Sequence, residues 1–338
     1  MKSTITDVAK QAGVSMKTVS RVLNNEPNVA KKTREKVLAS ARELRYSPNL
    51  AARGLASSKS YMIALAYDNS PSLNYLSPIQ QGAIMACREN GFHLVVEPLE
   101  MRGTDVSEEM EQLLERLPVD GIILTSPLCD NPDVLAILKR LGVAYVSVSP
   151  SKPEEGAACV VMDNTQASYE MTQFLIQQGH RNIGFIKGHP EHNSSTLRYL
   201  GFVKAMEAAA IDLNMEWVVD GDFSFRSGVK AAEALLSNND RPTAIFASND
   251  DMAAGVVSVA NRLGISVPGQ LSVGGFDDTP LASILWPQLT TVKQPIYQMG
   301  HRAASLLINP PETDECLGIY NLDHQLIVRE STAQNSIT

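Results

Sequence analysis

Beyond residue 60, short apolar runs alternate with longer segments of helical periodicity, and this alternation limits the possible folds. Short apolar runs of this kind are typical of buried parallel strands. They occur at Ile63–Tyr67, Leu94–Val96, Gly121–Leu124, Tyr145–Val148, Ile183–Ile186, Ala244–Ala247 and Leu271–Gly274. Helical segments between them stop at glycine, as at Gly91, Gly142 and Gly264. The pattern predicts doubly wound α/β sheets with too many strands for one sheet, and therefore two lobes.

The first sixty residues differ from the rest of the chain in charge. They hold twelve Lys or Arg against four Asp or Glu, a balance of +8, whereas the remainder holds seventeen against thirty-three, a balance of −16. Blocks of opposite charge in one chain indicate a nucleic-acid-binding head joined to a body with another task.

Composition and spacing argue against several classes of protein. No stretch is apolar enough to span a bilayer, and the N-terminus lacks a secretory apolar region, so we expect a cytoplasmic, nucleoid-associated protein with no membrane partner. Four scattered cysteines form no C-x-x-C pair, which predicts buried thiols rather than a metal site or disulfides: Cys87, Cys129, Cys159 and Cys316. Gly274-Gly275 lacks the dinucleotide-binding spacing, and no catalytic constellation stands out. We expect neither a cofactor nor an enzyme.

The head has the pattern of three short helices. Apolar residues recur at helical spacing up to Ala12, Gly13 interrupts them, and Ser15 stands where a second helix would be capped. A third amphipathic stretch runs from about Lys31 to Leu44. This is a small all-α helix-turn-helix arrangement, in which the second helix enters the major groove.

The first residues of the second helix are therefore the candidates for reading bases: Ser15, Met16, Lys17 and Thr18, with Ser20 and Arg21 one turn on. Lys17 and Arg21 can donate hydrogen bonds to guanine. Met16 can pack on a thymine methyl or support its neighbours. A bland alternative remains, since any short helical hairpin with surface Lys and Arg has this appearance.

Longer motifs in the head resemble the LacI family of bacterial transcription regulators. They are Ile5-Thr6-Asp7-Val8-Ala9, Ala12-Gly13-Val14-Ser15, Thr18-Val19-Ser20-Arg21-Val22-Leu23-Asn24, Thr33-Arg34-Glu35-Lys36-Val37 and Tyr46-Ser47-Pro48-Asn49. The resemblance assigns the reading of bases to Ser15, Met16, Lys17 and Arg21. It also implies contacts that position the head on DNA phosphates. The residues so implied are Thr4, Thr18, Ser20, Asn24 and Thr33.

The resemblance also makes residues 48–56 a hinge helix that folds when two copies meet over the minor groove. It implies minor-groove contacts by Asn49, Ala52 and Leu55, with Leu55 wedged between base pairs. Gly54 costs about 1 kcal/mol of helix propensity, and so short a helix is marginal in isolation. The alternative for Leu55 is a linker residue that covers nearby apolar surface.

The resemblance continues through the body, in Gln178-Gly179-His180, Gly201-Phe202, Ala247-Ser248-Asn249-Asp250, Gly275-Phe276-Asp277-Asp278 and Leu289-Thr290-Thr291-Val292. It implies two Rossmann-like lobes resembling periplasmic sugar-binding proteins, joined by crossovers near Val160–Asp163, Leu289–Val292 and Gly318–Leu322. We expect a DNA-binding domain over 1–47, a hinge over 48–60 and a two-lobed body over 61–338. Lobe 1 would hold about 61–160 and 291–319, and lobe 2 about 161–290 and 320–338.

Parallel sheets bind ligands beyond the carboxyl ends of their strands. With the resemblance, this predicts effector contacts by Ser72, Asn74, Ser126, Ser147, Asp163, Arg198, Phe223, Asn249, Asp277 and Trp286. Asn249 and Asp277 have the alternative of helix caps or turn residues, and Asp250 is best explained as a cap. Arg198 could instead form a surface ion pair. Phe223 and Trp286 could instead be ordinary core residues. His189 and His192 lie on the loop before Arg198, but no carboxylate or cysteine stands at metal-ligand spacing from them, so we expect no metal site there.

These patterns predict a homodimeric repressor that reads a pseudo-palindromic DNA operator and is released by a small-molecule effector. We favour a sugar, because aromatic faces and opposed donors and acceptors suit its C–H surfaces and hydroxyls. Alternatives are a purine corepressor and, in another class, a sugar-binding protein with no DNA role. No apolar heptad follows Ser331, so we expect a dimer rather than a tetramer.

Overall fold

The computed structural model describes residues 3–23, 27–46, 59–68, 73–101, 105–154, 156–237, 240–311 and 318–335. The chain divides into two compact units, Met1–Tyr61 and Met62–Thr338, which we call the head and the body. No helix in the described part of the chain is long and apolar enough to cross a membrane.

The described residues of the head form three helices, α1 (Ile5–Ala12), α2 (Met16–Leu23) and α3 (Lys31–Glu43). Thr4 caps α1 in a reciprocal capping box with Asp7, and Gly13 ends it at φ 65°. Apolar faces of all three helices form one small core: Val8, Ala9, Ala12, Val19, Val22, Val37 and Ala41. The predicted three-helix pattern is confirmed.

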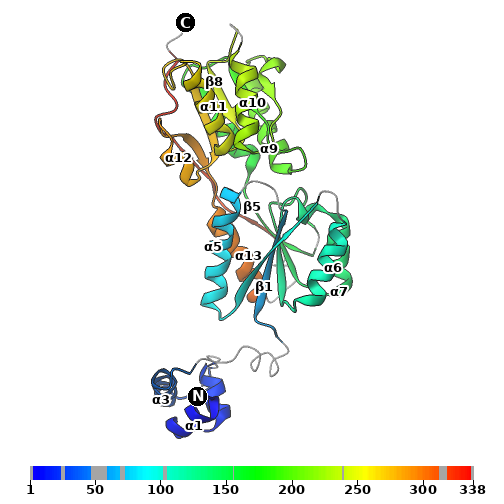
Figure 1. Ribbon diagram of the computed structural model, residues 1–338, viewed down its shortest axis with the longest axis vertical. Coiled ribbons are helices and arrows are strands. Elements are labelled where there is room, and N and C mark those ends of the chain that lie inside the picture. Colours follow the sequence, from blue (N-terminus) through cyan, green and yellow to red (C-terminus); the bar gives the residue numbers. More distant parts are fainter. Residues whose placement is uncertain are drawn as a thin grey trace. The chain divides into compact units, whose positions relative to one another are not determined.

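The body contains two six-stranded sheets. The first has the order β11-β5-β4-β3-β1-β2, and all its paired strands are parallel. Its strands are β1 (Met62–Asp68), β2 (His93–Leu99), β3 (Gly121–Thr125), β4 (Tyr145–Val148), β5 (Ala158–Val161) and β11 (Ile319–Asn321). Its helices are α5 (Leu73–Glu89), α6 (Val106–Arg116), the short η1 (Leu128–Asp130), α7 (Pro132–Leu141) and α13 (Ile296–Ile308). In Figure 1, α5 and α13 cover one face and α6 and α7 the other.

The second sheet has the order β12-β10-β9-β8-β6-β7, parallel except where β10 meets β12. Its strands are β6 (Ile183–Ile186), β7 (Val218–Val219), β8 (Ala244–Ala247), β9 (Ser272–Asp277), β10 (Thr290–Lys293) and β12 (Gln325–Ile327). Its helices are α8 (Asn164–Gln177), α9 (Asn193–Ala208), the short η2 (Met215–Trp217), α10 (Phe225–Leu236), α11 (Asp250–Arg262) and α12 (Pro280–Ile284). The two doubly wound lobes predicted from the sequence are therefore present.

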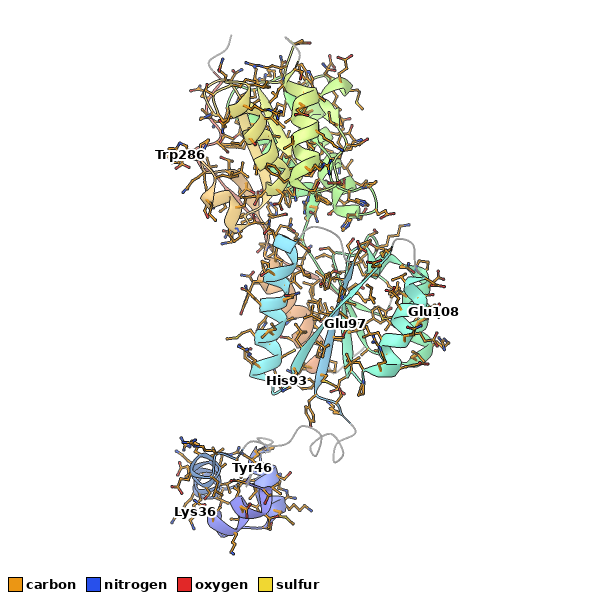
Figure 2. The ribbon with its side chains drawn as sticks, viewed as in Figure 1. Lys36, Tyr46, His93, Glu97, Glu108 and Trp286 are labelled. Carbon is orange, nitrogen blue, oxygen red and sulfur yellow. The ribbon has the colours of Figure 1, made fainter. Side chains whose placement is uncertain are left out.

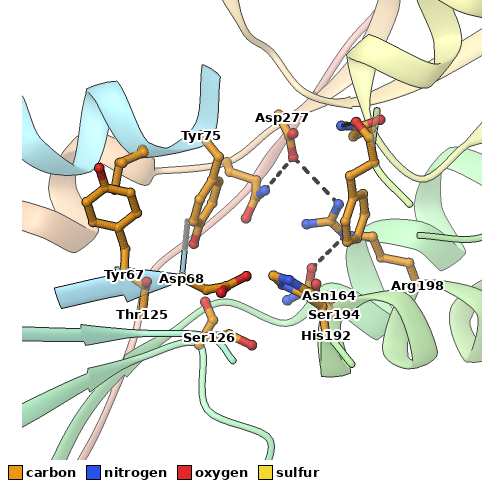
Figure 3. Close-up of a pocket in the computed structure, with 15 residues that line it drawn as sticks. Tyr67, Asp68, Tyr75, Thr125, Ser126, Asn164, His192, Ser194, Arg198 and Asp277 are labelled. Atoms are coloured by element: carbon orange, nitrogen blue, oxygen red, sulfur yellow. Dashed lines mark hydrogen bonds and ion pairs between the residues drawn. The ribbon is translucent and has the colours of Figure 1, made fainter. Parts of the chain in front are cut away.

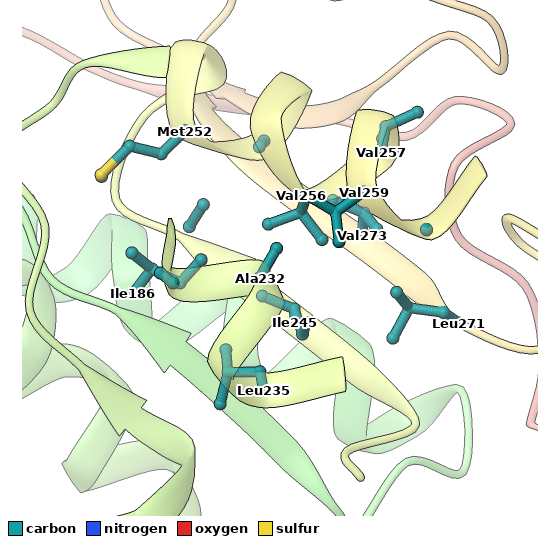
Figure 4. Packing of buried hydrophobic residues seen from close by; sticks show 14 of the residues in the cluster. Ile186, Ala232, Leu235, Ile245, Met252, Val256, Val257, Val259, Leu271 and Val273 are labelled. Atoms are coloured by element: carbon teal, nitrogen blue, oxygen red, sulfur yellow. The ribbon is translucent and has the colours of Figure 1, made fainter. Parts of the chain in front are cut away.

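Apolar side chains of α10, α11 and the second sheet pack into a continuous core, shown in Figure 4. Ile245 and Val273 on neighbouring strands are fully buried beneath Ala232 and Val256 of the two helices. The first lobe has its own core around Ile122, Leu124 and Met110, and its described cysteines are buried free thiols: Cys87, Cys129 and Cys159. Cys316 lies outside the described residues.

Glycines allow α5 and α13 to pack in close contact on the first sheet. A Cβ at Gly82 would lie 2.0 Å from the Tyr297 carbonyl oxygen, and one at Gly300 would lie 2.1 Å from the Ile79 carbonyl oxygen. Neither approach leaves room for a side chain, so the two backbones meet here directly.

The chain crosses between the sheets after β5, after β10 and after β11. The first and third crossovers fall within a few residues of the expected ranges. The second begins after Lys293, one residue beyond the expected Leu289–Val292, because Thr290–Lys293 continues the second sheet beside β9.

Candidate functional site

A cavity opens at the carboxyl ends of the strands of both sheets and spans about 720 Å³ of non-atom space, counting the part that is open to solvent. Its lining comes from segments that directly end or follow β1, β3, β4, β8, β9 and β10, and from the starts of α5, α8 and α9. This is the position at which open parallel sheets bind ligands. Figure 3 shows the polar residues of its floor and walls.

Arg198 forms the centre of the floor, although its side chain is only 4% exposed. Its Nε donates to Asn164 Oδ1 at 2.9 Å, and its Nη1 donates to the Ser248 carbonyl oxygen. The guanidinium carbon lies 3.7 Å from the ring centroid of Phe276, over the ring. Asn164 of α8, Ser248 after β8 and Phe276 of β9 thus surround this cation of α9, and Nη1 lies 3.6 Å from Asp277 Oδ1 (Figure 3).

Asp277 ends β9 and faces the cavity from a strained backbone position at φ 116°. Gln294, which follows β10, donates from Nε2 to its carboxylate. Burial raises the pKa of Asp277 to about 6, and Arg198 and Gln294 oppose that rise. Asp277 therefore titrates close to neutral pH, unlike an ordinary surface aspartate.

Phe223 supplies a flat apolar face beside this polar floor. It too has a positive φ, 69°, on the loop before α10. A Cβ at Gly188 would lie 2.0 Å from Phe223 Cζ, so the absence of a side chain at residue 188 lets the ring occupy its place. The positive φ of Phe223 and the missing side chain at Gly188 therefore fix this aromatic ring at the cavity wall.

His192 stands at the N-cap position of α9 and packs edge-on against Phe223, with ring centroids 5.6 Å apart. The imidazole of His189 also packs edge-on against it, with ring centroids 5.5 Å apart. Burial, with His189 and Arg198 nearby, lowers the pKa of His192 to about 4. The His192 imidazole is therefore neutral at physiological pH.

The first lobe contributes the opposite wall, with Tyr67, Asp68, Tyr75 and Ser126 among its residues. Burial raises the pKa of Tyr75 to about 12, which keeps the phenol a hydrogen-bond donor. Among the residues that the structure describes, Ser126 Oγ is the buried side-chain polar atom without a hydrogen-bond partner. Such an orphan costs about 1–3 kcal/mol, so a ligand that satisfied it would gain affinity.

The structure brings together five of the residues predicted to contact the effector: Ser126, Arg198, Phe223, Asn249 and Asp277. Four others do not line the cavity: Asn74, Ser147, Asp163 and Trp286. Ser72 lies outside the described residues. The sequence prediction thus found most of the second-lobe floor and little of the first-lobe wall.

Each of the four has a structural reason for its position. Trp286 follows α12 with 81% of its surface exposed, away from the cavity (Figure 2). Asp163 is exposed and caps α8 by accepting from the Gln166 backbone N–H. Ser147 is buried within β4, between β3 and β5. Asn74 donates from Nδ2 across the lobes to both carboxylate oxygens of Asp251, at 2.9 and 3.1 Å.

Asn249 and Asp250 also differ in part from expectation. Asn249 is the N-cap of α11, accepting from Met252 N–H, so this cavity-lining residue also has the capping role raised as its alternative. Asp250 is not a cap. It is fully buried and accepts from the Thr279 backbone N–H and from the hydroxyls of Thr279 and Thr291. Its pKa is raised well above the usual value by burial and by Asp277.

Sequence reasoning missed several cavity residues that a stricter use of the strand-end rule would have found. Asp68 and Thr125 end β1 and β3, and Gln294 directly follows β10. Asn164 stands beside the chosen Asp163, but it is the residue turned toward Arg198. Tyr75 comes from inside α5 and carries no strand-end signal.

In the head, the four proposed base-reading residues are exposed: Ser15, Met16 and Lys17 at the start of α2, and Arg21 in its last turn. Ser15 Oγ accepts from the Thr18 backbone N–H, as a cap does. Met16 is 53% exposed, and its sulfur accepts from the Thr6 hydroxyl, which agrees with a supporting role.

Of the four phosphate-contact candidates within the described residues, Thr4 is exposed, and three are half-buried: Thr18, Ser20 and Thr33. Thr4 lies at the start of α1, Thr18 and Ser20 on α2, and Thr33 in the first turn of α3. Asn24 and the hinge residues Asn49, Ala52 and Leu55 lie outside the described residues.

Two family models match the chain. Residues 4–49 match the model of bacterial regulatory proteins of the lacI family, and residues 172–332 match a periplasmic binding protein-like domain. Catabolite control protein A of Priestia megaterium is 34% identical over 98% of this chain and 100% of its own length. The chain belongs to the LacI family. It is a DNA-binding transcription regulator with an effector-binding body.

Other relatives and solved structures extend over similar lengths. The HTH-type transcriptional repressor PurR of Pectobacterium carotovorum is 36% identical over 91% of this chain and 90% of that protein. A complex of the regulator CelR with cellobiose covers 97% of this chain and 99% of its own, at 33% identity and a TM-score of 0.74. The lac repressor dimer, bound to operator and the anti-inducer ONPF, covers 98% of this chain and 100% of its own, at 30% identity and a TM-score of 0.78.

Proposed function

We propose that this LacI-family regulator is a dimeric repressor of carbohydrate-utilisation genes, released from its operator when a sugar enters the cavity of the body. The observation that carries the proposal is the composition of that cavity. The aromatic face of Phe223 lies beside a floor of opposed donors and acceptors around Arg198 and Asp277. An aromatic face can pack against the C–H groups of a sugar, while the hydroxyls of the sugar need donors and acceptors together.

The orphan hydroxyl of Ser126 supports a polar ligand at this place. It lines the cavity from the first lobe, whereas Arg198 and Asp277 line it from the second. A ligand that contacts both walls favours one arrangement of the lobes over another, since it binds only the arrangement that presents both.

The head then responds through its connection to the body. We propose that residues 1–47 read the operator, that residues 48–60 form the hinge, and that residues 61–338 bind effector and the second copy. Ser15, Met16, Lys17 and Arg21 would contact bases, and Thr4, Thr18, Ser20, Asn24 and Thr33 phosphates. Asn49, Ala52 and Leu55 would enter the minor groove. Operator binding must in turn change effector affinity by the same factor.

Calorimetry and operator-release assays on the full-length protein test the proposal. A panel of neutral mono- and disaccharides, including cellobiose and ribose, is titrated into the protein with and without operator DNA. We expect one or more sugars to bind and to weaken operator affinity. Arg198→Met should abolish that binding, while circular dichroism confirms that the variant is folded. Full operator affinity at saturating sugar would refute release as the mechanism.

A purine corepressor is the second candidate, and two observations favour it. Several relatives are named PurR, and the rings of Tyr75 and Phe223 at the cavity could stack on a base. Guanine and hypoxanthine therefore belong in the same titrations. A purine that binds and strengthens operator affinity, with no sugar binding, would replace the sugar proposal.

A further inference from the structure

We propose that the cavity selects an uncharged effector and refuses phosphorylated or carboxylated ones, and that His192 is the residue that sets this selectivity. The inference deepens the proposed function, because it names the charge class of the ligand for the same cavity. It rests on how the charges of the lining residues are already matched.

Arg198 is the permanently charged cation among the residues that line the cavity. Its charge is already opposed by Asp277, 3.6 Å away, and two of its N–H groups are used by Asn164 and Ser248. An anionic ligand that took this cation would leave Asp277 without its partner in a buried site. Separating a buried pair in this way is strongly unfavourable.

Carboxylates oppose an anion from the other directions. Asp68 lines the first-lobe wall, and Asp251, on the first turn of α11, lies close enough to act electrostatically on Asp277. The N-terminus of α9 favours an anion, but it carries only about half a positive charge. The carboxylate of Asp68 on the opposite wall opposes this partial charge, while Asp277 already matches the charge of Arg198.

His192 occupies the place where a cation would complete an anion site. It lines the cavity at the start of α9, on the same helix as Arg198. Its ring packs edge-on against those of Phe223 and His189, with centroids 5.6 and 5.5 Å away, and burial lowers its pKa to about 4. A neutral imidazole here offers a sugar hydroxyl one donor and one acceptor but gives no charge to a phosphate.

Matched ligands test the inference on the full-length protein. Glucose is compared with glucose 6-phosphate and glucuronate, and galactose with galactose 6-phosphate and galacturonate, by calorimetry at fixed ionic strength. We expect each anionic member to bind at least about tenfold more weakly than its neutral counterpart. An anionic member that binds as tightly as the neutral sugar, or more tightly, would overturn the inference while leaving a sugar effector in place.

Inorganic phosphate provides an arm that does not depend on sugar binding. Thermal unfolding is followed with increasing phosphate against chloride of equal ionic strength. No saturable phosphate stabilisation is expected for the native protein or for His192→Gln, and a saturable increase is expected for His192→Lys. Saturable stabilisation of the native protein, or no gain in the lysine variant, counts against the inference. If no sugar binds at all, the proposed function fails, and this arm still decides the charge class.

Discussion

Lowering the pH should weaken effector binding through Asp277. Burial raises the pKa of this carboxyl to about 6, so it is almost fully ionised near pH 7.5 and about one-tenth ionised near pH 5. A sugar hydroxyl that donates to the carboxylate binds only the ionised form. Apparent affinity follows the competent fraction, so it should fall about tenfold, or about 1.4 kcal/mol, over this range.

The sign follows from the direction of the shift. When the pH falls below the Asp277 pKa of about 6, the carboxyl takes up a proton, the charge opposite Arg198 disappears, and an acceptor becomes a donor. The neighbouring His192 does not contribute to this change, because its pKa of about 4 lies below the range. Affinity should therefore decrease steadily from pH 7 to pH 5.

Calorimetry of the best-binding sugar at five pH values provides the measurement. Asp277→Asn is the matched control, since it keeps the shape and an oxygen acceptor for Gln294 but cannot titrate. Its affinity should be lower than that of the native protein and nearly independent of pH. A native affinity that changes less than about twofold over the range, with Asp277→Asn binding normally, would refute the reasoning.

Three further predictions concern the aromatic wall, the lobe contact and the head. Gly188→Ala should force the Phe223 ring from its place and weaken sugar binding at least about tenfold. Gly318→Ala is the control and should leave sugar binding unchanged, because a Cβ there would meet no atom within 4 Å. Equal affinities of the two variants would contradict the packing of Phe223 against Gly188. Asn74→Ala removes the donor to Asp251, and should lower the free energy of unfolding by about 1 kcal/mol in urea denaturation, with Gln81→Ala on the same helix as the control. Unchanged stability would mean that this contact contributes nothing. Lys17→Ala should weaken specific operator binding by about 1–3 kcal/mol and relax discrimination at one base pair, while Arg42→Ala on α3 should not relax it; a uniform loss over all DNA sequences would make Lys17 a phosphate contact.

The sequence by itself determined the elements and the division of the chain. Gly13 and Ser15 mark the turn of the head, and α3 begins at Lys31 as its pattern predicted. Apolar strands and glycine stops likewise predicted two doubly wound lobes. These features are local, because each depends on propensity, capping or burial within a few neighbouring residues.

Only the tertiary structure decided which polar residues meet. Asp163 and Asn164 are neighbours in sequence, yet the first caps a helix in solvent and the second accepts from the buried Arg198. The direction of a side chain and the sheet to which a strand is added depend on distant contacts, as β10 shows by pairing with β9. Asn74 contacts Asp251 across 177 positions, and Trp286 is exposed beyond α12. No local pattern encodes such pairings, because they arise only when the two lobes have been assembled.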